Sequence, residues 1–159
     1  MRVAVLCFSM ALCVAAGRGQ SASGAASKSD QNDLDGLVKT LSNYSDDLQA
    51  MMKSVSGAEL DELATIQENA ASDSNMLYLA TRELRILDSV NCSTDRVKVA
   101  RMIADDLGFY IFHFNSQATR FTSLLPILKS PAIAETGIKL RDTLRTAKDK
   151  LEAIKTTLR

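Results

Sequence analysis

The chain has 159 residues with 19 basic and 19 acidic side chains, so it suits one domain and lacks the basic excess of a nucleic-acid-binding protein. Hydrophobic residues make up 46% of the sequence, whereas Gly (7) and Pro (2) are scarce and Trp is absent. This composition argues against wholesale disorder and against a turn-rich β-sandwich or barrel.

The first segment has the pattern of a secretory signal peptide. A positive start precedes the apolar run Val3–Ala16, which is broken by a single serine and followed by small residues. A transmembrane span needs about 20 apolar residues, so we predict a signal peptide over 1–16, cleaved after Ala16 or Gly17. The alternative is a buried N-terminal helix, but the next residues are linker-like. We therefore expect an exported protein, periplasmic or secreted, with a flexible linker over 17–29 and no membrane span in the mature chain.

Cleavage of this segment would leave Cys92 as the one cysteine, so the mature chain would form no internal disulfide. Such a cysteine is buried, is a free thiol or pairs with another chain. A catalytic cysteine needs a base beside it, and the one histidine, His113, is 21 residues away. The sequence therefore predicts a free or intermolecular thiol rather than a nucleophile.

The rest of the chain, residues 30–159, predicts an all-α domain of four amphipathic helices. Apolar residues recur at spacings of three and four, and the four stripes cover 34–55, 63–87, 100–121 and 133–158. A repeat of 3.5 residues is typical of coiled coils, and short connections make consecutive helices antiparallel. We therefore predict an up-down-up-down four-helix bundle. The alternative is a pair of helical hairpins that complete their core by dimerising.

Helix ends are predicted from residues that can bond free backbone N–H groups. The predicted caps are Ser29 or Asp30 for the first helix, Ser56 with Glu59 as a capping box for the second, Ser93 for the third and Ser130 before Pro131 for the fourth. The second stripe is interrupted at residues 73–75, where we expect a kink or a polar layer in the core.

Charge is distributed unevenly along the chain. Residues 30–73 carry a net charge of −8, and residues 74–159 carry +5. Because the first and last helices of such a bundle are neighbours, we expect the acidic first helices to pair with the basic last one. The alternative is a dipolar surface that meets a partner.

The most unusual stretch is residues 109–121, which holds five of the seven aromatic residues of the mature chain. On a helix, Tyr110 and Phe114 face the core, whereas Phe109 and Phe112 point to a different side. Two interpretations follow: a crowded bundle centre, or a second apolar surface for a ligand or a partner.

Metal and haem sites are disfavoured. Di-iron bundles need Glu-x-x-His pairs on two helices and c-type haem needs C-x-x-C-H, and the sequence contains neither. A b-type haem held by His113 and one of Met51, Met52, Met76 or Met102 is geometrically conceivable, but methionine is more often a core filler. We predict a partly buried, hydrogen-bonded histidine and no cofactor.

Common catalytic and nucleotide-binding motifs are absent, and two glycosylation sequons begin at Asn43 and Asn91. We expect a non-enzymatic, exported bundle that binds another protein through its Phe109 and Phe112 side, with a homodimer as a further option. The alternative is a carrier or sensor that holds an apolar small molecule near the stretch Tyr110 to Phe114, with Phe112 and His113 between them. An enzyme ranks third, because one His and one Cys do not assemble a catalytic site.

Overall fold

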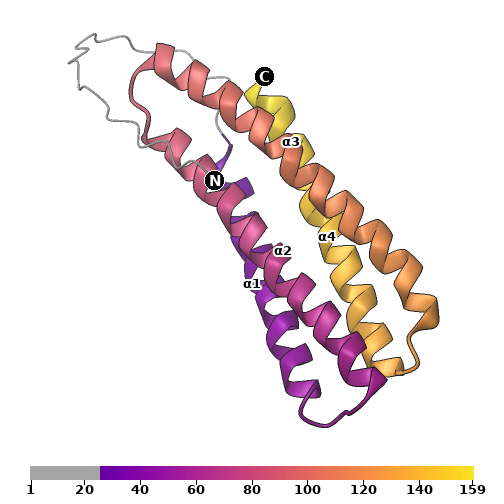
Figure 1. Ribbon diagram of the computed structural model, residues 1–159. Coiled ribbons are helices and arrows are strands. Elements are labelled where there is room, and N and C mark those ends of the chain that lie inside the picture. Colours follow the sequence, from indigo (N-terminus) through magenta and orange to yellow (C-terminus); the bar gives the residue numbers. More distant parts are fainter. Residues whose placement is uncertain (1–25) are drawn as a thin grey trace, which may run out of the picture.

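The computed structural model describes residues 26–159, so the predicted signal peptide and most of the predicted linker lie outside the described range. This part of the chain consists of helices and contains no strand, which confirms the all-α prediction (Figure 1). The elements are α1 (Lys28–Met51), α2 (Ala58–Ser89), α3 (Ser93–Leu124), the short 3-10 helix η1 (Leu125–Ile127) and α4 (Pro131–Leu158).

Consecutive helices run in opposite directions (Figure 1). α1 packs along α2 and α3 packs along α4, so the molecule contains two helical hairpins. The hairpins meet through α1 against α4 and through α2 against α3. One chain thus brings all four helices together, and a second chain is not needed to complete the core.

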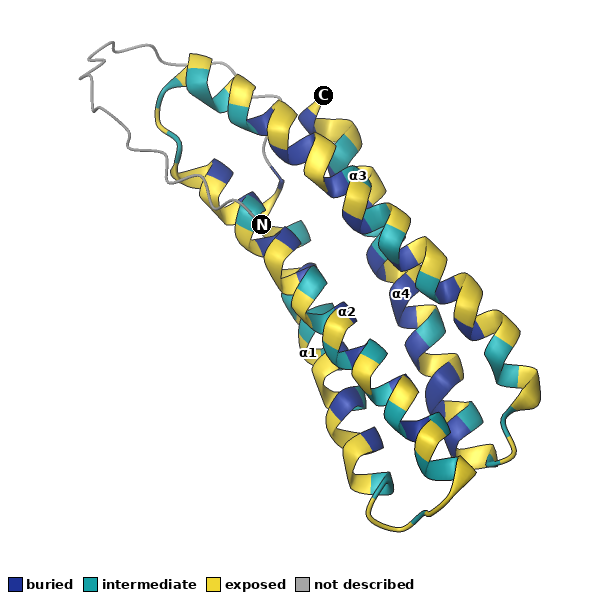
Figure 2. Cartoon of the chain, viewed as in Figure 1, coloured by how far each residue is buried: buried dark blue, intermediate teal, exposed yellow. Residues whose placement is uncertain are grey.

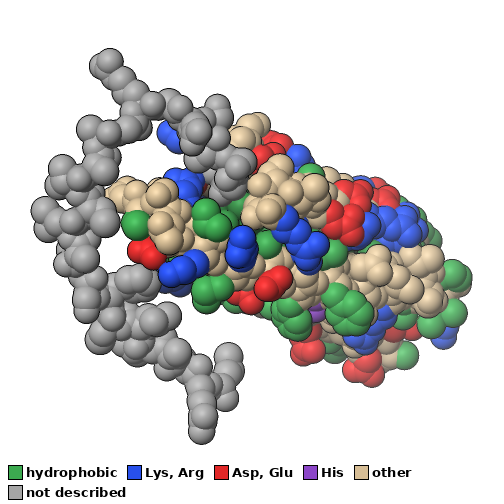
Figure 3. Space-filling view, turned by 90° about the horizontal axis from the view of Figure 1, so that it is seen from above, with side chains coloured by type: hydrophobic (Ala, Val, Ile, Leu, Met, Phe, Trp, Pro, Cys, Tyr) green, Lys and Arg blue, Asp and Glu red, His purple; other side chains and the backbone are tan. Residues whose placement is uncertain are grey.

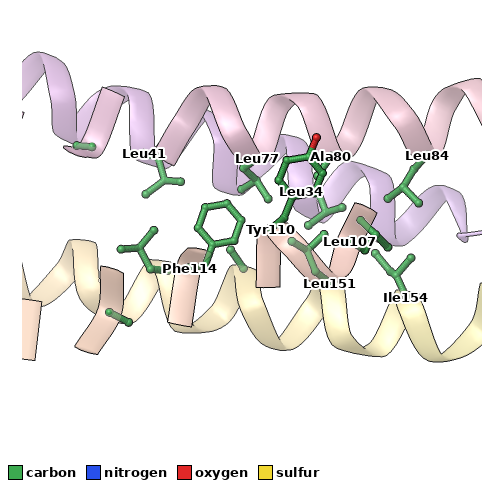
Figure 4. Packing of buried hydrophobic residues seen from close by; sticks show 14 of the residues in the cluster. Leu34, Leu41, Leu77, Ala80, Leu84, Leu107, Tyr110, Phe114, Leu151 and Ile154 are labelled. Atoms are coloured by element: carbon green, nitrogen blue, oxygen red, sulfur yellow. The ribbon is translucent and has the colours of Figure 1, made fainter. Parts of the chain in front are cut away.

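The core is built from the predicted apolar stripes. Dark blue positions follow the inward sides of the helices in Figure 2, with exposed positions on the outer sides. Leu41, Leu77, Phe114 and Leu151 come from the four different helices, and each is completely buried (Figure 4). Burying a side chain of this size contributes roughly 1.5–3 kcal/mol, so this interior stabilises the bundle without a disulfide.

The helix ends differ in detail from the sequence prediction. Ser27 caps α1: its hydroxyl accepts a hydrogen bond from the Asp30 N–H, and the Asp30 carboxylate accepts one from the Ser27 N–H. The predicted cap Ser29 lies inside the first turn instead. At α2 the N-cap is Gly57, with a φ of 65° and no side-chain bond, so the predicted capping box at Ser56 is wrong. Glycine adopts this left-handed conformation readily, and the sharp turn places the serine before the N-cap.

The other two starts are closer to the prediction. The N-cap of α3 is Cys92, one residue before the predicted Ser93. The N-cap of α4 is at the predicted Ser130, with Pro131 in the first turn, but the Ser130 side chain forms no capping hydrogen bond.

The expected charge pairing between the first and last helices occurs at one ion pair. Lys150 Nζ of α4 lies 2.6 Å from Asp33 Oδ2 of α1. Arg85 and Asp35 join α2 to α1, whereas the remaining ion pairs of α4 join residues of that same helix. Exposed pairs contribute about 0–1 kcal/mol each, so they supplement the apolar core rather than replace it.

Candidate interaction surface

Polar side chains cross the contact between α2 and α3, which we call the α2–α3 seam. The pairs are Asn69 with Gln117, Asp73 with His113, Glu83 with Tyr110 and Asp88 with Arg96. Within residues 26–159, every buried side-chain polar atom without a partner lies on the same seam: Asp73 Oδ2, Glu83 Oε2, Arg96 Nε and Gln117 Oε1. The contact of α2 with α3 therefore combines paired polar groups with the shared apolar core.

Asp73 and His113 form the most buried of these pairs. Asp73 is completely buried, and its Oδ1 lies 2.7 Å from His113 Nε2. Burial raises the pKa of the Asp73 carboxyl above its usual value, and His113 offsets part of that rise. α2 is continuous through this position and Asp73 is buried there, so the predicted interruption at residues 73–75 contains a polar layer in the core. The prediction of a partly buried, hydrogen-bonded histidine is confirmed.

Glu83 and Tyr110 form a second pair, nearly three turns further along α2 and about one turn away on α3. The Tyr110 hydroxyl donates to Glu83 Oε1 at 2.9 Å. Burial raises the pKa of Glu83, with the Tyr110 hydrogen bond acting in the opposite direction. Burial also raises the pKa of Tyr110, and the neighbouring carboxylate adds to that rise. Both groups are tied into the packing of α2 against α3.

The aromatic stretch divides between two surroundings, as its helical spacing predicts. Tyr110 and Phe114 are buried in the core, whereas Phe109 and Phe112 are 62% and 72% exposed. His113 lies between these groups and is turned toward α2. The residues considered for a small-molecule site therefore do not line one pocket: one faces solvent, one lies in the core and two bond to α2.

Other apolar side chains extend the exposed surface of α3. Val97 and Met102 are 51% and 61% exposed. Together with Phe109 and Phe112 they make up what we call the outer α3 face. Hydrophobic side chains also lie beside the single histidine in the space-filling view (Figure 3). Contiguous exposed apolar surface of several hundred Å² marks interaction sites in other proteins, whereas scattered apolar side chains are normal.

A shallow hollow lies at the N-terminal end of the outer α3 face. Its volume is about 430 Å³, and it is lined by Ser93, Thr94, Val97, Lys98 and Arg101. Another hollow, of about 440 Å³, lies beside the C-terminal turns of α4 and includes Ile111. Both are surface depressions with charged rims.

The described residues contain no cluster of three His, Cys, Asp or Glu side chains that could hold a metal ion. No helix between residues 26 and 159 is long and apolar enough to cross a membrane. Cys92 is half-buried and forms no disulfide within this range, and the other two cysteines, Cys7 and Cys13, lie outside it. Asn43 and Asn91 are both exposed.

The exposure of Phe109 and Phe112 follows from helical spacing, whereas the pairing of His113 with Asp73 does not. The available signal was Asp73 itself, an acidic residue within the apolar stripe of α2. Comparisons add no relative to this picture: no protein-family model, curated protein or solved structure matches this chain.

Proposed function

We propose that this is an exported, non-enzymatic protein that acts by binding another protein through the outer α3 face. The supporting observation is the exposure of Phe109 and Phe112 on a helix whose opposite side already fills the core. Covering a phenylalanine side chain contributes roughly 1.5–3 kcal/mol, and aromatic residues are enriched at the centres of protein interfaces.

The placement of the titratable groups supports binding rather than catalysis. Asp73, His113 and Glu83 are engaged in contacts between α2 and α3, beneath the surface that a substrate would meet. Raised carboxyl pKa values are found both in catalytic sites and in structural networks. Here the pairs join two packed helices, which favours the structural interpretation.

A carrier of an apolar small molecule has less support. Phe112 and Phe114 belong to opposite sides of α3, one facing solvent and the other the core. Phe114 is surrounded by leucine side chains from the neighbouring helices (Figure 4). A common binding cavity for these two rings would require α3 to leave its place in the bundle.

Site-specific photo-cross-linking tests the proposal. A photoreactive phenylalanine analogue at position 112 should form adducts with another protein chain in the source cells. The same analogue at Gln49, an exposed residue of α1, should not. Phe109→Ser should reduce the adducts at position 112 at least fivefold, because it removes the neighbouring apolar contact. Equal labelling at positions 49 and 112, or no adduct at 112, would exclude this surface.

A further inference from the structure

We infer that the occupant of the outer α3 face is a second copy of this chain, with two α3 helices packed antiparallel about a twofold axis. This inference rests on the proposed function, since it names the partner of that surface. It follows from the charges, the spacing and the hollow on the outer side of α3.

Opposite charges without partners lie one turn apart on this face. Arg101 and Asp105 are both exposed, and neither forms an ion pair with another residue of the described chain. A basic residue that precedes an acidic one by four positions makes a poorer pair within a helix than the reverse order. The two charges are therefore available to a second helix.

The positions around these charges lie along one stripe of α3. The residues at 94, 98, 101, 105, 108 and 112 are separated by four and three residues alternately. Helices pack along stripes of this spacing in coiled coils, where the positions are apolar. Here Phe112 is the one large apolar side chain of the stripe, and Arg101 and Asp105 are charged. The stripe faces away from the core stripe, which carries Leu107 and Phe114.

Arg101 and Asp105 are complementary to a second copy whose α3 runs in the opposite direction. An axis midway between Arg101 and Asp105 places Arg101 of each copy opposite Asp105 of the other, so two ion pairs form. The same axis places Thr94 of one copy opposite Phe112 of the other, and Lys98 opposite Gly108, where Lys155 Nζ of α4 also lies. A twofold contact of this kind uses the same surface on both chains, so the assembly is complete with two chains.

The hollow on α3 matches the shape that this arrangement needs. Thr94, Val97, Lys98 and Arg101 are related as positions i, i+3, i+4 and i+7, which is the four-residue hole of knobs-into-holes packing. Side chains on a helix lean toward its N-terminus, so the Phe112 ring of the second copy lies over this hole. Phe109 and Met102 lie next to this stripe, on the side of α3 that is nearer to α2.

The two exposed rings supply part of the apolar area that a stable dimer buries. Phe109 and Phe112 are 62% and 72% exposed, and an aromatic side chain presents about 150–250 Å², so the two rings expose roughly 200–340 Å². A standard interface covers about 800 Å² on each partner, of which about 60% is apolar. Phe109 and Phe112 alone therefore supply roughly half of the apolar share of such an interface.

Charge reversal tests both the partner and the direction of packing. Sedimentation equilibrium of the purified protein, in reducing agent to keep Cys92 unlinked, should give twice the chain mass. Arg101→Glu or Asp105→Arg alone should raise the dimer dissociation constant at least tenfold, because each places like charges opposite one another. The double variant Arg101→Glu/Asp105→Arg should restore the dimer to within threefold of the wild type. Arg120→Glu changes charge by the same amount but lies beyond the overlap of the two helices, so it should have no effect.

A wild-type chain that stays monomeric at 0.5 mM overturns the inference, as does a dimer that Arg101→Glu leaves unchanged. Failure of the double variant to recover excludes this antiparallel register. The cross-linking experiment separates this inference from the proposed function. Adducts at position 112 with twice the chain mass support a second copy. Adducts with a different protein keep the proposed function but overturn the inference, and the absence of any adduct overturns both.

Discussion

At the scale of single residues, the carboxyl groups of Asp73 and Glu83 distinguish the α2–α3 seam from the rest of the bundle. Each has one oxygen in a hydrogen bond and the other buried without a partner. A buried polar atom without a partner costs roughly 1–3 kcal/mol. Leucine pairs can slide past one another, whereas these hydrogen bonds form at only one axial register of α2 against α3.

The buried carboxyl of Asp73 makes stability depend on pH. Its pKa in the folded protein is raised above the ordinary value of 3.8, so the folded state holds the proton more tightly than the unfolded state does. The contribution of Asp73 to the free energy of unfolding is therefore greatest below about pH 4 and falls as pH rises toward the raised pKa. The loss is about 1.4 kcal/mol for each tenfold difference in proton affinity.

Asp73→Asn removes this ionisation and keeps a group that can hydrogen-bond to His113. Urea denaturation between pH 4 and 7 should show the wild type losing stability relative to the variant as pH rises. Taking the difference between the two chains removes the contributions of the other carboxyl groups. A wild type that gains stability relative to the variant over this range would contradict the assignment.

The pair of Glu83 and Tyr110 predicts a non-additive response to mutation. Tyr110→Phe removes the donor and leaves a half-buried carboxylate, which should lower the free energy of unfolding by roughly 1–3 kcal/mol. Adding Glu83→Leu should recover most of that loss, because both polar partners are then replaced by apolar groups. Chemical denaturation of the two single variants and the double variant measures the coupling. If the losses of the two single variants add up to the loss of the double variant, the hydrogen bond contributes no coupling energy.

At the scale of the helices, local capping decides where α1 begins. Ser27 and Ser29 are both suitable N-cap residues, but only Ser27 exchanges hydrogen bonds with Asp30. Ala26, just before the cap, is buried in the core cluster. Its burial fixes the direction in which the chain enters the helix and so selects between the two serines.

Alanine substitutions at the two serines should separate these roles. Ser27→Ala should lower the free energy of unfolding by about 1 kcal/mol, because it leaves a backbone N–H at the helix start without its acceptor. Ser29→Ala, inside the first turn, should change it by less than about 0.5 kcal/mol. Thermal and urea denaturation of the two variants provide the comparison, and equal losses would place the cap elsewhere.

The helices were predictable from the sequence because burial of one side leaves a regular apolar repeat. Leu41 and Leu77 mark that repeat in α1 and α2, and both are fully buried. Contacts between different helices were harder to predict from the sequence. The bond from His113 to Asp73 spans 40 residues and depends on the rotation and axial register of α2 against α3, which no local pattern encodes. The exposure of Phe112 was predictable, since helical spacing alone separates it from Phe114.

At the scale of the whole molecule, the neutral net charge conceals an uneven distribution. The acidic first part and the basic last part meet at Asp33 and Lys150, where α1 lies beside α4. Most other charges of α4 are balanced within that helix. On α3, Arg101 and Asp105 are exposed and form no ion pair with another described residue.

Export of the chain can be tested by its mass. Protein recovered from the periplasm or the medium should begin at Gly17 or Arg18, because the proposed signal peptide is removed during translocation. Intact-mass measurement identifies the new N-terminus. A chain made without residues 1–16 should stay in the cytoplasm, and recovery of the exported protein with Met1 still present would exclude cleavage.

The positions of the chain ends have a further consequence. The start of α1 and the end of α4 lie at the same end of the bundle (Figure 1), and these two helices are already neighbours. A short linker between these ends would close the four helices into a ring without changing any helix contact. A circular permutant opened near Gly57, in the turn between α1 and α2, should therefore keep the helical circular dichroism spectrum of the native chain. The same four-helix arrangement could then be built from chains that begin at different loops.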